Sequence, residues 1–151
     1  MRYLFIFIFS FGAFAQEGKA VRPVAKPDCQ LTTTTQPALE SCTFRQYRFT
    51  SEAGPSLRGF KVSRMESGNY IPTSLELIFK DKAHALRFFN NGLRKEHERR
   101  IKGGEPCPEF SEAQLTDLGI RFEGEKAVIS FIGGGCGQFK VSLRELERLL
   151  K

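Results

Sequence analysis

The order of patterns along the chain predicts an α+β fold, in which a mainly antiparallel sheet is packed by one long helix and a C-terminal helix. Strand-like segments separated by turn residues come first, and one long helical pattern follows at 82–102. Further strand-like segments then precede a last helical pattern that begins at Ser142. Strands and helices that are segregated in this way favour α+β over an alternating parallel sheet.

The first half of the chain contains short segments with alternating apolar residues. Residues 43–50 are predicted to form a half-exposed strand with a bulge or edge character, after an extended segment or loop at 30–41. Residues 57–64 alternate again, and turn residues at 52–56 and 67–69 flank this segment. The segment 71–79 is compatible with a strand or with a turn of helix.

The long helix is expected to span about Lys82 to Lys102, with Asp81 as its N-cap. Leu86, Phe89, Leu93 and His97 form an apolar stripe along it. Gly92 lies inside the pattern and weakens an isolated helix by about 1 kcal/mol relative to alanine. Gly103 and Gly104 end the helix.

The second half predicts a short helix from Ser111, with Gln114 as its capping-box partner. A hairpin follows, in which residues 123–126 join the strands 120–122 and 127–132. The glycine-rich run 133–137 breaks the sheet before a last strand at 139–141. Ser142 and Glu145 form a second capping box, and four leucines give the terminal helix its apolar face.

Residues 1–15 have the three-part pattern of a secretory signal peptide: a basic start, an apolar run and small residues before the cleavage point. The apolar run ends at Phe14, shorter than the about 20 residues of a membrane-spanning helix. We therefore expect a cleaved signal, no transmembrane anchor after cleavage, and a periplasmic or secreted protein. Residues 16–28 are proline-containing and basic, which predicts a flexible leader before a single α+β domain at 29–151.

The four cysteines, Cys29, Cys42, Cys107 and Cys136, all lie after the predicted signal. An even number in an exported chain indicates disulfide bonds, and three connectivities are open. Pairing within local segments favours Cys29–Cys42 and Cys107–Cys136. A zinc site is disfavoured because the chain has no C-x-x-C pair and both histidines lie elsewhere, so no metal or cofactor is predicted.

No motif for catalysis is present, and we predict that the chain is not an enzyme. The sequence has no G-x-S-x-G or H-E-x-x-H, and His97 is interpreted as a packed structural histidine. The glycine-rich run lacks the Lys-Ser/Thr of a phosphate-binding loop. The candidate contact surface consists of the basic helix end and this run: Arg94, Lys95, Arg99, Arg100, Lys102, Gly133, Gly134 and Gly135. A merely solvated helix face is the alternative.

From Ile71 onward, about 80 residues carry a further pattern. Its parts are a Leu-x-Leu-x-Phe-Lys segment before the helix, a Gly-apolar-x-Phe strand, and a Ser-x-x-Glu-Leu helix start; here these are Leu75–Lys80, Gly119–Phe122 and Ser142–Leu146. In this order the chain resembles the extracytoplasmic domain of unknown function found at the C-terminus of the lysozyme-sensing anti-sigma factor RsiV and beside a peptidoglycan deacetylase.

The resemblance implies an extracytoplasmic α+β domain associated with envelope or wall biology. Its motifs are structural rather than catalytic. The chain departs from the family where Ile132 and the glycine-rich run replace a tyrosine-containing segment, and it shows no transmembrane helix or cytoplasmic anti-sigma part. Signalling by regulated proteolysis is therefore not implied. Lysozyme binding does not carry over residue by residue, and a basic domain is poorly matched to basic lysozymes.

Charge and location together give the expected function. The formal net charge is +6, and loss of Arg2 with the signal leaves +5, which favours an anionic protein or envelope polymer as partner. Nucleic acid is not expected outside the cytoplasm. We expect an exported, non-enzymatic binding module for a protein or wall polymer. The alternatives are an enzyme acting on cell-wall material and a structural envelope protein with no small ligand.

Overall fold

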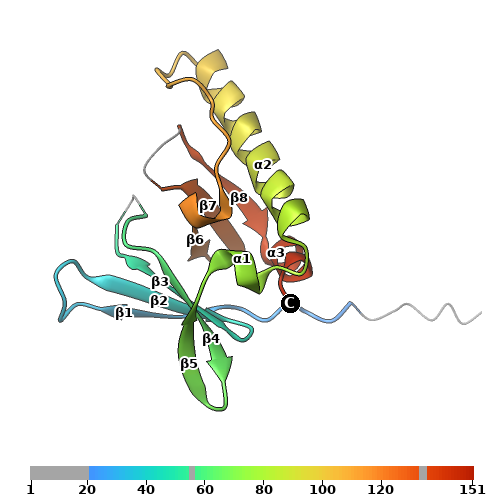
Figure 1. Ribbon diagram of the computed structural model, residues 1–151. Coiled ribbons are helices and arrows are strands. Elements are labelled where there is room, and N and C mark those ends of the chain that lie inside the picture. The colour runs from blue at the N-terminus through green and yellow to red at the C-terminus, as the bar shows by residue number, and fades with distance from the viewer. Residues whose placement is uncertain (1–20, 55–56, 133–135) are drawn as a thin grey trace, which may run out of the picture.

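The computed structural model describes residues 21–54, 57–132 and 136–151, and its architecture is α+β, as predicted (Figure 1). The strands form two antiparallel sheets, one ordered β1-β2-β3-β4-β5 and one ordered β6-β7-β8. The elements are β1 (Asp28–Thr32), β2 (Leu39–Phe44), β3 (Tyr47–Glu52), β4 (Lys61–Glu66), β5 (Asn69–Thr73), α1 (Leu75–Ile78), α2 (Lys82–Lys102), the 3-10 helix η1 (Leu115–Asp117), β6 (Leu118–Glu123), β7 (Lys126–Phe131), β8 (Gln138–Ser142) and α3 (Leu143–Leu149).

The segment 43–50 is not one bulged strand, so that prediction is wrong. It contains the end of β2 and the start of β3, which Arg45 and Gln46 join as a two-residue turn between the paired residues Phe44 and Tyr47. Arg45 has the left-handed φ of 59°, which side chains other than glycine seldom adopt. The β4–β5 turn also uses positive φ, at Ser67 (48°) and Gly68 (85°), where the sequence does predict a turn.

Helix α2 spans the predicted residues and lies along the three-stranded sheet (Figure 1). The Asp81 carboxylate accepts a hydrogen bond from the backbone N–H of His84 at 2.9 Å, which confirms the predicted N-cap. This bond also lowers the pKa of Asp81 from its usual value. Opposite Gly92 lies the ring of Phe139 from β8, so close that a Cβ on Gly92 would stand 2.4 Å from the ring carbons.

The short helix predicted from Ser111 is absent from the structure, which has only η1, capped by Gln114 and Asp117. The cause is Asn90 of α2, which is 6% exposed. Its side chain donates to the carbonyl of Ala113 at 3.0 Å and accepts from the N–H of Ala113 at 2.9 Å. Since both backbone groups of Ala113 are bound to α2, this segment runs extended along the helix.

The C-terminal capping box is confirmed: Ser142 and Glu145 bond reciprocally at the start of α3. After α3 the chain pairs with the segment that follows α1. Phe79 and Leu150 form an antiparallel bridge, the N–H of Lys80 donates to Leu149 at 2.9 Å, and the N–H of Lys151 donates to Ile78 at 2.9 Å.

Aromatic side chains join the two sheets. The ring of Phe122 from β6 lies 5.6 Å from that of Phe44 and 5.3 Å from that of Phe49. Tyr47 is fully buried beside them. Its hydroxyl accepts a hydrogen bond from the Gln46 side chain at 2.9 Å and lies 3.5 Å from the carbonyl of Ile78. The β2–β3 turn is therefore fixed against the α1–α3 region.

Candidate functional site

The basic end of α2 is largely neutralised by acidic side chains. Arg99 and Arg100 both bind the carboxylate of Glu96, at 2.7 and 2.9 Å, and Arg100 also reaches Glu105 at 3.2 Å. These guanidinium groups lower the pKa of Glu96 to about 2, with the Arg99 hydrogen bond as the largest cause. Two of the five predicted contact cations are therefore held in ion pairs on the helix itself.

Arg94 is a third paired cation. It forms a 3.0 Å ion pair with Glu112, and its guanidinium lies 4.7 Å from the centre of the Phe110 ring. Its contacts hold the α2–β6 connection against the helix. Within the part of the chain that the structure describes, Lys95 and Lys102 are the two predicted contact cations without a carboxylate partner, and both are exposed.

The glycine-rich run was the other half of the predicted contact surface. Gly133, Gly134 and Gly135 lie outside the described residues. Gly137, which follows them, has a φ of 103°, and a Cβ there would stand 2.8 Å from Nε of Arg100 and 3.0 Å from Cγ of Glu96. The end of the run therefore packs directly on the Glu96–Arg100 pair, and this close approach requires glycine.

Both disulfides have the favoured pairing. Cys29–Cys42 joins residues directly opposite in β1 and β2, and Cys107–Cys136 joins the α2–β6 and β7–β8 connections. Two disulfides indicate an oxidising compartment, extracellular or periplasmic. Glu40 lies with Cys29 and Cys42 in a cluster whose ligand-type atoms fall within 4.8 Å of one another, but the sulfur atoms are bonded to each other and offer no thiolate.

His97 is 7% exposed and serves packing, as predicted. Its Nε2 lies 2.7 Å from the carbonyl oxygen of Pro108, which can only accept, so this nitrogen donates the hydrogen bond. The imidazole also packs edge-on against Phe110. The histidine therefore fixes the α2–β6 connection beside the Arg94 contacts.

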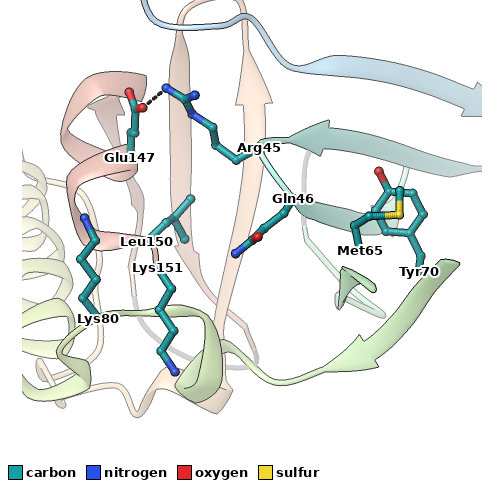
Figure 2. A pocket seen from close by; sticks show the side chains of 8 residues that line it. All are labelled: Arg45, Gln46, Met65, Tyr70, Lys80, Glu147, Leu150 and Lys151. Carbon is teal, nitrogen blue, oxygen red and sulfur yellow. Dashed lines mark ion pairs between the residues drawn. The ribbon is translucent and has the colours of Figure 1, made fainter. Parts of the chain in front are cut away.

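A pocket of about 630 Å³ lies where the β2–β3 turn, the β4–β5 hairpin and the C-terminal segment meet (Figure 2). We call it the Arg45 pocket. It is lined by Arg45, Gln46, Met65, Tyr70, Lys80, Glu147, Leu150 and Lys151.

Local backbone geometry brings the basic side chains of the Arg45 pocket together. The left-handed turn residue Arg45 directs its guanidinium to Glu147 of α3, with which it forms an ion pair (Figure 2). The Phe79–Leu150 bridge places Lys80 and Lys151 on neighbouring, paired segments. Three cationic side chains from three parts of the chain thus line the pocket with one acidic side chain, Glu147, so its side chains carry a net positive charge. The ammonium group of Lys80 also lies 3.4 Å from the carbonyl oxygen of Arg148, to which it donates.

The other side of the Arg45 pocket is apolar. Met65 and Tyr70 are paired residues of β4 and β5, and they stand together across the pocket from Leu150 and the lysines (Figure 2). Met65 is 38% exposed although it is a large apolar residue. The pocket therefore offers cations on one side and an apolar, aromatic surface on the other, which suits a ligand with an anionic group on a partly apolar body.

Comparison with protein-family models, with curated proteins and with solved structures finds no match. Within the described residues, 21–54, 57–132 and 136–151, no helix is both long enough and apolar enough to cross a membrane.

Proposed function

We propose that this chain is an exported, non-enzymatic binding domain of the cell envelope, and that it holds an anionic, carboxylate-bearing ligand in the Arg45 pocket. The observation that carries the proposal is that Arg45, Lys80 and Lys151 line one pocket with a single acidic side chain, Glu147, which is paired with Arg45. Lysine and arginine side chains bind carboxylates by charge-assisted hydrogen bonds. The pocket also falls within the size range of small-ligand sites.

The backbone of Arg45 supports the same assignment. A non-glycine residue in the left-handed region costs about 1 kcal/mol or more, and such residues are frequent at binding sites. The fold fixes the turn through the buried ring of Tyr47, which places the guanidinium before any ligand arrives. A pre-positioned cation lowers the entropic cost of binding.

Export and an envelope location rest on two features of the chain. The two disulfides indicate an oxidising compartment, and residues 1–15 carry the signal-peptide pattern. The resemblance to the RsiV-type domain points to the same surroundings, where anionic wall polymers and acidic protein surfaces are available partners.

The lining of the Arg45 pocket favours binding over catalysis. Glu147 is the one acid among the eight residues that line it, and its carboxylate is paired with Arg45. His97, the histidine on the apolar stripe of α2, donates its Nε2 proton to a backbone carbonyl. An enzyme acting on wall material would need an acid or base free to exchange protons with the substrate.

The test uses galacturonate, a simple carboxylated sugar, with galactose as its neutral counterpart. Titration of the ¹⁵N-labelled domain with galacturonate should shift the amide signals of residues 45–46, 65–70, 80 and 147–151, and galactose should not. The double variant Lys80→Gln/Lys151→Gln should bind galacturonate about tenfold more weakly, since each cation contributes a charge-assisted bond that is partly screened by solvent.

The matched control is Lys95→Gln/Lys102→Gln, which removes the same charge from the two free cations of the α2 end. Unchanged affinity in this variant supports the pocket. An equal loss in both variants would mean that net charge alone attracts the ligand, and shifts confined to the α2 end would move the site there. Cleavage of a galacturonate oligomer by the wild-type protein would contradict the non-enzymatic assignment.

A further inference from the structure

The outward face of the five-stranded sheet combines polar and charged side chains with a few apolar and aromatic ones across its last three strands. Strand register pairs Arg48 with Ser63 and Thr50 with Lys61, and the next pairing places Met65 opposite Tyr70. Their neighbours along the strands, Tyr47, Phe49 and Val62, point to the buried side. The side chains on the outward face are Arg48, Thr50, Glu52, Lys61, Ser63, Met65, Tyr70 and Pro72.

A second hollow lies on this face, at the opposite end from the Arg45 pocket. It has a volume of about 360 Å³ and lies between the 35–37 loop and strands β3 and β4. Its lining is rich in hydroxyl, amide and charged groups: Thr35, Gln36, Thr50, Glu52, Lys61 and Ser63, with Pro37, Leu39 and Gly59. Met65 and Tyr70, which share the outward face, line the Arg45 pocket.

Arg48 and Tyr70 connect the two hollows. The guanidinium of Arg48 extends over β4 and lies 3.7 Å from the centre of the Tyr70 ring. Stacking on an aromatic ring orients the guanidinium plane and leaves the N–H groups at its edge available to a ligand. Arg48 is exposed and, among the described residues, has no carboxylate partner.

The cations on this face follow the strands. Lys61 and Arg48 are diagonal neighbours on adjacent strands, about 7–8 Å apart at their backbones. A line from Lys61 to Arg48, continued along the sheet, leads to the Arg45 pocket. From Glu52, at one end of β3, to Gln46, in the β2–β3 turn, the chain advances six residues, which corresponds to about 20 Å.

We propose that the ligand is a linear acidic polysaccharide that lies along the outward face of β3–β5, with one carboxylate in the Arg45 pocket and following units over Arg48 and into the second hollow. This inference rests on the proposed function of the Arg45 pocket and extends it from a single anionic group to a polymer. Successive carboxylates meet the Arg45 pocket, Arg48 and Lys61, and sugar hydroxyls meet Thr50, Ser63 and Gln36. Glu52, at the far end, accepts from hydroxyl groups.

The lining favours a glycan over an acidic peptide. Hydroxyl and amide side chains in the second hollow match the many donors and acceptors of a polyol. An extended peptide gains most of its affinity by pairing with the backbone at a sheet edge, whereas β3 and β4 are both paired on either side and offer only their side-chain face.

The test measures the affinity of galacturonate oligomers from one to six units by calorimetry. For the wild-type protein, affinity should rise with length and stop rising once the oligomer covers about 20 Å. Arg48→Gln/Lys61→Gln should weaken hexamer binding about tenfold and leave monomer binding unchanged. Lys80→Gln/Lys151→Gln should weaken both, and Lys95→Gln/Lys102→Gln should weaken neither.

Each outcome separates the two proposals. If the monomer binds and affinity does not rise with oligomer length, the proposed binding of a polymer along β3–β5 is wrong, and the Arg45 pocket remains as a site for a single anionic group. If the hexamer binds in a way that depends on Arg48 and Lys61 but the monomer does not bind, the result supports binding along β3–β5 and not a separate site in the Arg45 pocket. Absence of all binding would overturn both proposals. Poly-L-glutamate that binds as tightly as the hexamer, with the same dependence on Arg48 and Lys61, would replace the glycan by an acidic peptide.

A second measurement does not depend on the variants. In the wild-type protein, the hexamer should shift amide signals of residues 48–52 and 61–65 in addition to those of the Arg45 pocket. Shifts limited to the Arg45 pocket would contradict binding of the polymer along β3–β5. This result would hold even if one of the variants failed to fold, because the measurement uses the wild-type protein alone.

Discussion

Asn90 and Ala113 exchange two hydrogen bonds, at 3.0 and 2.9 Å, in a buried position between α2 and the connection to β6. One side chain thereby satisfies both backbone groups of a residue 23 positions away. The connection has little regular structure of its own, so its path depends on this pair, on the Cys107–Cys136 disulfide and on the contacts of Arg94 and His97.

Replacement of Asn90 by alanine should lower the free energy of unfolding by about 3 kcal/mol, because it leaves the N–H and the carbonyl of Ala113 without partners in the interior. Chemical denaturation monitored by circular dichroism measures the change. Asn91→Ala is the matched control, since Asn91 is exposed on the same helix, and it should change stability by less than about 0.5 kcal/mol. Equal losses in the two variants would rule out the bonded pair as the cause.

Gly92→Ala should destabilise the protein although alanine is the better helix former. The added methyl would stand 2.4 Å from the ring of Phe139, and relief of this overlap costs about 1–3 kcal/mol, more than the about 1 kcal/mol gained in helix propensity. Thermal melts should show the effect. In the background Phe139→Ala the same substitution should be neutral or stabilising, and a loss in that background would contradict the contact.

Glu96 should make stability depend on pH in the acidic range. Its pKa is about 2 in the folded protein against 4.5 normally, so its stabilisation is fully present above pH 4.5 and is lost as the pH falls towards 2. Glu96→Gln should therefore lower the free energy of unfolding by about 1 kcal/mol at pH 6 and leave it nearly unchanged at pH 2.

The control for Glu96 is Glu98→Gln, an exposed position on the same helix. Urea denaturation of wild type and both variants between pH 2 and pH 6 gives the comparison. The pKa values of Glu123 and Glu145 are also lowered by their hydrogen bonds, so every variant keeps some pH dependence. A Glu96→Gln effect of the same size at all pH values would contradict the ion-pair assignment.

The two disulfides should protect different parts of the chain. Loop closure over 29 residues gives Cys107–Cys136 about 3.6 kcal/mol of stabilisation, against about 2.9 kcal/mol for the 13-residue Cys29–Cys42. Hydrogen exchange should rise at 103–117 in Cys107→Ala/Cys136→Ala and only around β1 in Cys29→Ala/Cys42→Ala. Increased exchange spread evenly over the protein in both variants would show that neither bridge acts locally.

The elements that could be predicted from the sequence have local signals. Asp81 before an apolar stripe defined α2, and Ser142 with Glu145 defined the start of α3. The β2–β3 hairpin was missed because its turn contains Arg45 and Gln46, without glycine, asparagine or aspartate. Residues of those types signal a turn because they adopt positive φ at low cost, and Arg45 adopts it through tertiary packing.

The candidate site was missed for a different reason. Its basic residues lie at positions 45, 80 and 151, and only the Phe79–Leu150 bridge and the packing of Tyr47 bring them together. The basic run of α2 is visible in the sequence, and so is the spacing of Glu96 three and four residues before Arg99 and Arg100. The pairs with Glu105 and Glu112 could not be predicted, since these residues belong to the connection that folds back along the helix.

Among the described residues, every paired strand in either sheet is hydrogen-bonded to the strand next to it in the sequence. Each pairing closes only a short loop, so the entropic cost of bringing the strands together is small. Local pairing of this kind is typical of fast-folding chains. We therefore expect the two sheets to form independently, before Phe122 meets Phe44 and Phe49 and before Phe79 pairs with Leu150. The Arg45 pocket requires the Phe79–Leu150 bridge, which brings Lys80 and Lys151 to neighbouring segments, so its ligand would select fully folded chains.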